Sequence, residues 1–399
     1  MDAKTIRDVE VEGKRVFLRA DLNVPLDDGR ITDDTRIRAS LPTIVNLLER
    51  GATVVLASHL GRPKGKVNEA LRLRPIAERL SQLLGRPVRM TGDALGPGVK
   101  VAVDKLRPGD LLLLENLRFH AAEEANDPEF AASLASLAEL YVNDAFGAAH
   151  RAHASTEGIT HHLPAVAGLL MEREVDALSR LLKRPARPFH AVIGGAKVSA
   201  KLEVLSALLS RCQAVLVGGG MANTFLAAKG TELGKSLVEG DQIDNALRIL
   251  AEARRKRVRL MLPTDAVVSP QIHQRSRTQT VPIRSVPKDQ MVVDIGPETL
   301  ATYTEHLARA KTIFWNGPMG VFEMPQMAEG TNGMARFLAK RARAGVVTIV
   351  GGGDSVAAVE QLGLAEKMTH VSTGGGASLE FLEGKTLPGV MALLPAEKA

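Results

Sequence analysis

The chain has 399 residues, of which 45% are hydrophobic and 24% charged, a composition that is typical of globular proteins and excludes a disordered or fibrous chain. This length predicts two or three domains. The net charge of +6 admits nucleic acid, a membrane surface or a small anion as partner. Aromatic residues make up only 3%, which disfavours the base-stacking surfaces of single-strand binders, so we favour a small anionic ligand.

Three absences narrow the class of protein further. No apolar run approaches the roughly 18 residues that a membrane-spanning helix needs. The N-terminus mixes charges of both signs and lacks an apolar core with a cleavage site, so we expect no secretory signal and a cytoplasmic protein. Cys212 is the single cysteine, which excludes an intramolecular disulfide and a cysteine-built metal cluster, and we expect it in the core.

Short apolar runs alternate with helical patterns along the first half, which is typical of βαβ units. Most of these runs show no polar and apolar alternation, so they predict parallel strands that are buried on both faces. The predicted strands are 15–22, 53–60, 110–117 and 140–144, and the predicted helices between them include 35–50, 73–84 and 128–140.

The second half repeats this scheme. Its predicted strands are 189–194, 213–218, 259–262, 291–295, 312–316 and 346–350. Between the halves, residues 171–183 predict an amphipathic helix, and the proline-containing segment 184–188 follows it, so we place the domain boundary there. The sequence therefore predicts an α/β fold of two units, each a parallel sheet flanked by helices.

Arginines and histidines follow the predicted strands of the first half. In open parallel sheets, ligands bind beyond the carboxyl ends of the strands, so these side chains would converge at one edge. Guanidinium groups bind phosphate and carboxylate with paired hydrogen bonds, and Asp21 and Asn23 suit a substrate hydroxyl. A small phosphorylated acid fits this set, whose members are Arg19, Asp21, Asn23, Arg36, His59, Arg62, Arg118, His120, His150 and Arg151. Taken alone, each arginine is better explained as a solvated surface residue or as part of a structural ion pair. For His59, His150 and His153, a role as hydrogen-bonded loop residues stays open beside a role as ligands.

Glycine-rich turns follow the predicted strands of the second half, at 194–197, 218–221, 351–355 and 374–378. Glycine lets backbone N–H groups approach a phosphate, and a helix N-terminus adds a favourable dipole. One such turn would be only a tight connection, but four at one sheet edge indicate a nucleotide site.

Three charged residues follow these turns. Lys197 and Lys201 are four residues apart, so we expect them on one helix face, either near the phosphates or as an exposed cationic face. We expect Asp354 to bind magnesium or to cap its helix.

Eight sequence motifs occur in a fixed order: RADLNVP (19–25), SHLGRP (58–63), ENLRF (115–119), NDAFGAAHRAHAST (143–156), GGAKVSAK (194–201), WNGPMGVFE (315–323), GGGDS (351–355) and STGGGAS (372–378). With these motifs the sequence resembles the bacterial phosphoglycerate kinases from end to end. Two departures are visible, since Ser355 stands where threonine is usual and Met319 where valine is common. Serine keeps the hydroxyl, and Met319 is expected to alter packing only.

The resemblance implies two Rossmann-like lobes that face a central cleft and are joined by a hinge helix. The implied parts are a phosphoglycerate-binding lobe (1–170), an interdomain helix and linker (171–188), a nucleotide-binding lobe (189–383) and a C-terminal segment that returns to the first lobe (384–399). The implied reaction is reversible in-line phosphoryl transfer between 1,3-bisphosphoglycerate and Mg-ADP, giving 3-phosphoglycerate and Mg-ATP, in a cytoplasmic monomer that binds neither nucleic acid nor membrane. Lobe closure would bring the substrates together and exclude water.

The resemblance also assigns site residues, motif by motif. The implied phosphoglycerate site contains Asp21, Asn23, Arg36, His59, Arg62, Arg118 and Arg151. The implied nucleotide site contains Gly195, Ala196, Lys201, Gly219, Gly220, Asn316, Pro318, Glu323, Gly352, Gly353, Asp354 and Ser355, with Glu323 toward the ribose and Asp354 toward Mg²⁺. Arg36, Lys197 and the backbone amides near Gly353 and Gly375 would stabilise the transferring phosphoryl group.

Three alternatives of other classes stay open. The first is a catalytically inactive protein that binds a nucleotide or another anion, although intact Arg36, Lys197 and Asp354 argue against it. The second is a basic protein that binds nucleic acid, which the glycine-rich strand ends disfavour. The third is a nicotinamide dehydrogenase, which lacks its G-x-G-x-x-G fingerprint at a strand end here.

Overall fold

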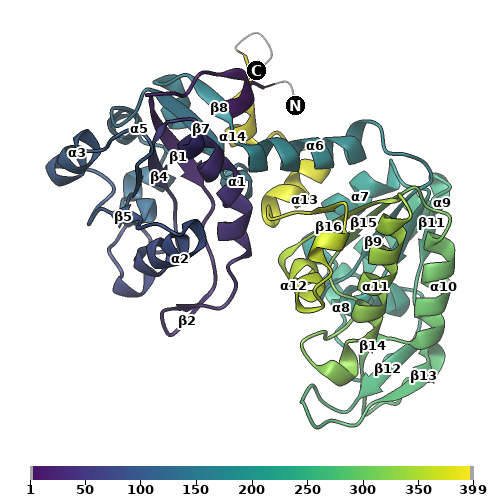
Figure 1. Ribbon diagram of the computed structural model, residues 1–399. Helices are drawn as coiled ribbons and strands as arrows, with labels where there is room; N and C mark the ends of the chain where they lie inside the picture. Colours follow the sequence, from purple (N-terminus) through teal and green to yellow (C-terminus); the bar gives the residue numbers. More distant parts are fainter. Residues whose placement is uncertain (1–2, 396–399) are drawn as a thin grey trace. The chain divides into compact units, whose positions relative to one another are not determined.

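The computed structural model describes residues 3–395, which form two compact units. The first unit comprises residues 3–176 and 386–395, and the second comprises residues 177–385. Each unit has its own six-stranded parallel sheet flanked by helices, which confirms the predicted α/β class (Figure 1). The boundary falls within helix α6 (Leu169–Lys183), and the role of this helix as a hinge stays a prediction.

The sheet of the first unit has the strand order β5-β6-β4-β1-β7-β8. Its strands are β1 (Arg15–Ala20), β4 (Thr53–Ala57), β5 (Arg89–Met90), β6 (Leu111–Leu113), β7 (Leu140–Asp144) and β8 (Ala165–Ala167), and each is parallel to its neighbours. Strand β1 comes first in the chain and lies centrally, with β4 on one side and β7 on the other. Open α/β sheets bind their ligands at such a switch in direction.

Helices cover this first sheet because their apolar faces complete its core. Buried side chains of α1 (Thr35–Glu49) and α2 (Arg74–Leu84), such as Ile44 and Leu80, share one hydrophobic cluster with β1 and β4. The remaining helices of the unit are α3 (Pro97–Asp104), α4 (Ala121–Glu124), α5 (Pro128–Ala135) and α14 (Pro388–Met391). A short antiparallel hairpin joins β2 (Leu26–Asp27) and β3 (Arg30–Ile31).

Helix α14 belongs to the first unit although it comes last in the chain. The backbone N–H of Gly389 donates to the carbonyl oxygen of Ala149 at 2.9 Å. The side-chain amide of Asn143 donates to the carbonyl oxygen of Gly389 at 3.1 Å. These bonds tie the chain's last described helix to β7 and to the loop that follows it.

The second unit has the strand order β11-β10-β9-β15-β16-β17, again parallel throughout. Its strands are β9 (Phe189–Ile193), β10 (Ala214–Val217), β11 (Arg259–Met261), β15 (Thr312–Asn316), β16 (Val347–Gly351) and β17 (His370–Val371). Its helices are α7 (Leu202–Leu209), α8 (Gly219–Ala228), α9 (Ile243–Arg255), α10 (Pro297–Leu307), α11 (Glu329–Arg343), α12 (Gly353–Gln361) and α13 (Gly376–Leu382). The change in direction lies between β9 and β15, so this edge is the expected ligand site.

One predicted strand belongs to a different sheet. We expected residues 291–295 in the parallel sheet, but β14 (Met291–Ile295) pairs antiparallel with β12 (Asp265–Ser269), which also pairs with β13 (Gln279–Pro282). The three strands lie side by side in the second unit (Figure 1). The prediction was wrong because an apolar run identifies a buried strand but not its partner. Here the run is covered by a separate small core that includes Leu226, Ala266 and Val268.

Several predicted elements were too long. The strands that we predicted to reach Leu22, Leu60 and Leu117 end at Ala20, Ala57 and Leu113, respectively. The three leucines are buried in the segments that follow these strands. The helix predicted at 128–140 ends at Ala135 because Leu140 already begins β7. Apolar periodicity reports burial, and loops that fold back over the sheet are buried too. Cys212 is buried, as we expected.

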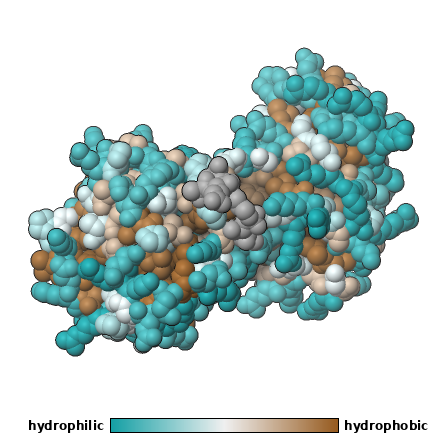
Figure 2. Space-filling model, turned by 90° about the horizontal axis from the view of Figure 1, so that it is seen from above, coloured by the Kyte–Doolittle hydropathy of each residue, from teal (hydrophilic) through white to brown (hydrophobic). Residues whose placement is uncertain are grey.

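Hydrophilic residues dominate the visible surface of each unit, with smaller hydrophobic areas between them (Figure 2). Among residues 3–395, the large hydrophobic side chains that are exposed are Val67, Val101, Leu237, Leu247 and Ile272. No helix in this part of the chain has the length and apolar character needed to cross a membrane.

Candidate functional site

In the first unit, the loop after β1 is joined to helix α1 and to the loop after β4. Asp21 accepts a hydrogen bond from Nη1 of Arg36 at 2.8 Å, and the carboxylate is almost fully buried. The side-chain oxygen of Asn23 accepts the backbone N–H of Gly61 at 2.9 Å. The polar residues predicted after two different strands therefore meet at one edge of the sheet.

The loop after β6 joins the same cluster through Arg118, which lies in a short 3₁₀ turn (Leu117–Phe119). Nη1 of Arg118 donates to the carbonyl oxygen of Gly61 at 2.9 Å. Burial, followed by the neighbouring charge of Arg19, lowers the pKa of Arg118. Arg118 is paired with Glu124 at 3.4 Å, but it also lies near the cations Arg19 and Arg151, so the cluster suits a further, negatively charged ligand.

His59 is 4% exposed, and its Nδ1 lies 3.1 Å from Nη2 of Arg19. Burial, followed by the charge of Arg19, holds the pKa of His59 well below its ordinary value, so the ring is neutral at neutral pH. Arg62 and Arg151 are exposed in the adjoining loops, and Nε of Arg151 contacts Nε2 of His150 at 3.1 Å. The structure thus brings Asp21, Asn23, Arg36, His59 and Arg118 together and leaves Arg62 and Arg151 at the surface.

In the second unit, glycines let three loops approach one another. The backbone N–H groups of Gly194, Gly195 and Gly219 donate at 2.9 Å to the carbonyl oxygens of Asn316, Pro318 and Met319, respectively. A Cβ atom on Gly194 would lie 2.1 Å from the carbonyl oxygen of Pro318. Only glycine allows this approach, so the loops after β9, β10 and β15 form one continuous backbone surface.

Helix α12, which follows β16, is attached to the same surface. The backbone N–H of Gly317 donates to the hydroxyl of Ser355, so the serine supplies the hydroxyl expected at this position. Asn316 is buried, and its Nδ2 has no hydrogen-bond partner among residues 3–395. Because a Cβ on Gly352 would lie 2.7 Å from this Nδ2, the glycine keeps the unused donor uncovered.

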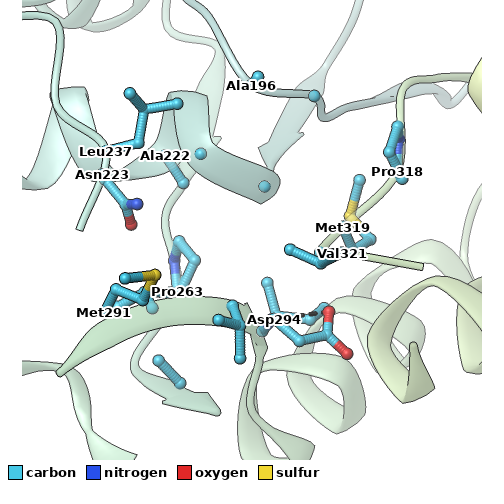
Figure 3. A pocket seen from close by; sticks show the side chains of 18 of the residues that line it. Ala196, Ala222, Asn223, Leu237, Pro263, Met291, Asp294, Pro318, Met319 and Val321 are labelled. Carbon is cyan, nitrogen blue, oxygen red and sulfur yellow. Dashed lines mark hydrogen bonds between the residues drawn. The ribbon is translucent and has the colours of Figure 1, made fainter. Parts of the chain in front are cut away.

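A pocket of about 290 Å³ lies against these loops (Figure 3). Seven predicted nucleotide residues line it: Gly195, Ala196, Gly219, Gly220, Pro318, Glu323 and Asp354. Sequence reasoning missed the apolar part of the lining. In Figure 3, Leu237, Asn223 and Met291 lie on one side of the pocket and Pro318, Met319 and Val321 on the other. An apolar slot beside glycine loops suits a flat heterocyclic base attached to phosphates.

Lys201 and Lys197 do not share a helix face, so that prediction was wrong. Helix α7 begins only at Leu202, after a 3₁₀ turn (Ser199–Lys201), and Lys197 is exposed in the preceding loop. Gly195, with φ of +106°, redirects the chain after β9 and so delays the helix. Nζ of Lys201 donates to the carbonyl oxygens of Gly194 (2.6 Å) and Asn316 (3.1 Å). Burial lowers the pKa of Lys201 to about 8, and Asp354 partly opposes this effect.

Asp354 is exposed at the second position of α12, and the N-cap residue is Gly352 without a side-chain capping bond. The alternative role of Asp354 as helix cap is therefore not observed. Within residues 3–395, no group of three or more His, Cys, Asp or Glu side chains is arranged to hold a metal ion. A lone carboxylate fits Mg²⁺ that arrives with a nucleotide, because such Mg²⁺ takes most of its ligands from phosphates and water.

Gly353 and Gly375 both lie at helix starts. Gly353 is the first residue of α12, and Gly375 precedes α13 with φ of +52°. The first backbone N–H groups of a helix have no partner within it, so they are available to an anion. Neither glycine lines the pocket described above.

The fold and both sites define a small-molecule kinase of the α/β class. The model of the family described as "Phosphoglycerate kinase" matches residues 6–385. The phosphoglycerate kinase of Pelotomaculum thermopropionicum is 55% identical over 394 residues, covering 99% of this chain and 100% of the relative. That of Moorella thermoacetica is 57% identical over 389 residues, covering 98% of both. The chain belongs to the phosphoglycerate kinase family.

Solved structures agree with this assignment. The phosphoglycerate kinase structure from Coxiella burnetii matches with a TM-score of 0.86 and 41% identity, covering 98% of each chain. The structure from Pyrococcus horikoshii OT3 matches with a TM-score of 0.87 and 35% identity, also covering 98% of each chain. The resemblance seen in the motifs is confirmed, and the chain is an enzyme with phosphoglycerate kinase activity. The alternative of an inactive binding protein is not supported.

Proposed function

We propose that this kinase binds the phosphoglycerate at the arginine cluster of the first unit and the Mg-nucleotide at the glycine-lined pocket of the second. The observation that carries this assignment is the chemical difference between the two sites. The site in the first unit contains guanidinium and imidazole groups, whereas the site in the second unit contains glycine backbone and an apolar slot. Guanidinium groups suit phosphate and carboxylate, whereas backbone N–H groups suit a polyphosphate.

At the acid site, the proposed ligands are Asp21, Asn23, Arg36, His59, Arg62, Arg118 and Arg151. Asp21 holds Arg36 in place, since the 2.8 Å ion pair fixes the guanidinium at the start of α1. Arg118 is fixed by the carbonyl oxygen of Gly61. The exposed Arg62 and Arg151 have the freedom to close on a bound anion.

At the nucleotide site, the apolar slot would take the base and the glycine loops the phosphates, with Glu323 toward the ribose. The further proposed ligands are Gly195, Ala196, Lys201, Gly219, Gly220, Asn316, Pro318, Gly352, Gly353, Asp354 and Ser355. Asp354 would bind Mg²⁺, which neutralises phosphate charge when it is bound. We also propose a cytoplasmic monomer, supported by the scatter of exposed hydrophobic residues, two of which line the nucleotide pocket.

In-line transfer between a carboxylate oxygen and a nucleotide oxygen needs no protein nucleophile. The residues act by positioning the reactants and by stabilising charge on the transferring group. Arg36, Lys197 and the backbone amides near Gly353 and Gly375 are the groups proposed for the second task. Lys197 is exposed, and among residues 3–395 its ammonium group has no buried ion pair that must break before it contacts a phosphoryl oxygen.

A coupled assay tests the reaction and the site together. It supplies 3-phosphoglycerate and Mg-ATP and follows NADH oxidation by glyceraldehyde-phosphate dehydrogenase. We expect an active wild type and a Lys197→Ala variant whose kcat is lower by about 100-fold or more, with both KM values nearly unchanged. Lys340→Ala, at an exposed position of α11, is the matched control. A silent, folded wild type would refute the reaction, and an unchanged kcat in Lys197→Ala would refute the role of Lys197.

A further inference from the structure

A buried chain of polar side chains lies behind the proposed phosphoglycerate site. Arg19 on β1, Ser155 in the loops after β7 and Glu123 in α4 are all fully buried. None of the three is a proposed ligand. Burying an arginine and a glutamate costs free energy of folding unless the two charges are paired and hydrogen-bonded. We therefore looked for a function of this buried network.

Ser155 joins the two charges through its hydroxyl group. Nε of Arg19 donates to Oγ of Ser155 at 2.7 Å, and this hydroxyl donates to Oε1 of Glu123 at 2.5 Å. The backbone N–H of Ser155 donates to the other carboxylate oxygen at 3.0 Å. The hydroxyl of Tyr141 donates to the carbonyl oxygen of Ser155 at 2.7 Å and so fixes the backbone of this serine.

The same network orients the guanidinium group of Arg19. Nη1 donates to the carbonyl oxygen of Ala20 at 2.5 Å, while Nε is committed to Ser155. With two of its three nitrogens fixed, the plane of the group is set. The third nitrogen, Nη2, lies 3.1 Å from Nδ1 of His59.

This contact decides where the proton of His59 resides. A guanidinium group has five N–H donors and no acceptor, so Nδ1 of His59 must be the acceptor. In the neutral ring the single proton then sits on Nε2. Within residues 3–395, Nε2 of His59 has no hydrogen-bond partner, so this N–H is available to a ligand.

The charged and titratable groups that act on His59 come from several elements. They are Arg19 from β1, Arg36 from α1, Arg118 from the 3₁₀ turn after β6, and His153 from the loops after β7. Burial, followed by these neighbours, holds the pKa of His59 well below its ordinary value, so the ring is neutral at neutral pH. A neutral ring must have the right tautomer to donate.

We propose that Arg19 is a positioning residue for the family reaction, because it fixes the Nε2–H tautomer of His59 and so makes this ring a donor to the bound phosphoglycerate. Ser155 and Glu123 hold Arg19 in the required orientation and supply its countercharge. This inference rests on the proposed phosphoglycerate site.

Nitrogen NMR of the ligand-free enzyme tests the tautomer directly. In protein labelled with ¹⁵N-histidine, with His59 assigned through a His59→Gln variant, we expect an unprotonated Nδ1 and a protonated Nε2 in the wild type. Arg19→Met should give a mixture of the two tautomers. Arg19→Lys, which keeps the charge and one donor, should restore part of the Nε2–H form. A wild-type ring with its proton on Nδ1 would overturn the proposal whatever the variants do.

Kinetics test the consequence for the substrate. Arg19→Met should raise the KM for 3-phosphoglycerate by about tenfold and leave the KM for Mg-ATP within about twofold. A merely structural role would change both KM values together.

Glu123→Gln is the matched control, because it removes the countercharge but leaves the guanidinium beside His59. We expect a lower free energy of unfolding with the Nε2–H tautomer retained. Retention of the Nε2–H form in Arg19→Met would refute the assignment to Arg19. An inactive wild type with the expected tautomer would refute the proposed function alone, since the NMR result does not depend on turnover.

Discussion

Nζ of Lys201 lies 2.6 Å from the carbonyl oxygen of Gly194, so this ammonium group is held by the backbone at the carboxyl end of β9. Two carbonyl oxygens are weak partners for a buried charge, and burial accordingly lowers the pKa of Lys201 to about 8. Near pH 8 about half of the molecules therefore carry a neutral amine.

Nucleotide binding is expected to take up a proton at Lys201. Phosphate oxygens beside the amine would favour its charged form and raise its pKa again. Calorimetric titration with Mg-ADP at pH 8, in two buffers of different ionisation enthalpy, measures the protons exchanged. We expect uptake by the wild type and a clearly smaller uptake by Lys201→Met. Equal uptake in both proteins would show that the proton goes elsewhere.

Asp21→Asn tests the acid site of the first unit. The substitution keeps the shape of the side chain but removes the charge that holds Arg36, so we expect the KM for 3-phosphoglycerate to rise by about tenfold. The KM for Mg-ATP should stay unchanged. Arg38→Ala is the control, because Arg38 makes an ion pair with Asp34 at 2.9 Å on the exposed side of the same helix. An equal effect of both variants would argue against a specific role of the buried pair.

The strand-end residues of both sites could be predicted because parallel strands carry the residues after them to one edge. Asn23, Gly61 and Arg118 are far apart in sequence, yet the topology alone places them together. The apolar lining of the nucleotide pocket could not be predicted in this way. It comes partly from Leu237 and from β14, which pairs antiparallel with β12 outside the parallel sheet.

Two other features of the sites could not be predicted from the sequence, for physical reasons. Lys197 was placed on a helix because periodicity does not register the positive φ of Gly195, which delays the start of α7. Glu123 lies in the polar segment AAEE, which reads as an exposed helix turn. Its partner Ser155 is 32 residues away and Arg19 more than 100, so the buried network is visible only in the folded chain.

Asp144 provides a test of stability against pH. Its Oδ1 accepts the backbone N–H groups of Leu170 (2.9 Å) and Met171 (3.2 Å) at the start of α6. Burial raises the pKa of Asp144 from 3.8 to about 6. Between about pH 4 and 6 the folded chain keeps a proton that the unfolded chain loses, so this carboxyl lowers the free energy of unfolding as pH rises, by at most about 3 kcal/mol.

Asp144→Asn should therefore stabilise the protein relative to wild type, with a gain that grows up to about pH 6 and is constant above it. Asp144→Ala, by contrast, leaves two buried N–H groups without an acceptor and should cost about 1–3 kcal/mol. Urea unfolding across this pH range, together with hydrogen exchange at Leu170 and Met171, measures both effects. A difference between Asn and wild type that does not change with pH would contradict the shifted pKa.

Gly330 is expected to be intolerant of any side chain. Its backbone N–H donates to Oδ2 of Asp294 at 2.6 Å, and a Cβ atom would lie 2.3 Å from the other carboxylate oxygen and 2.5 Å from Cγ1 of Ile295. Because Asp294 is buried and lines the nucleotide pocket, its side chain cannot move away from an added Cβ atom on Gly330. Gly330→Ala should lower the free energy of unfolding by about 1–3 kcal/mol and weaken Mg-ADP binding.

Gly98→Ala is the matched control for this prediction. Gly98 is the second residue of α3, as Gly330 is of α11, but a Cβ atom there would meet nothing within 4 Å. Alanine is the better helix former, so this change should leave stability equal or raise it by up to about 1 kcal/mol. Urea unfolding and Mg-ADP titration of both variants give the comparison. If the two alanines behaved alike, the contact between Gly330 and Asp294 would not limit the packing beneath the nucleotide pocket.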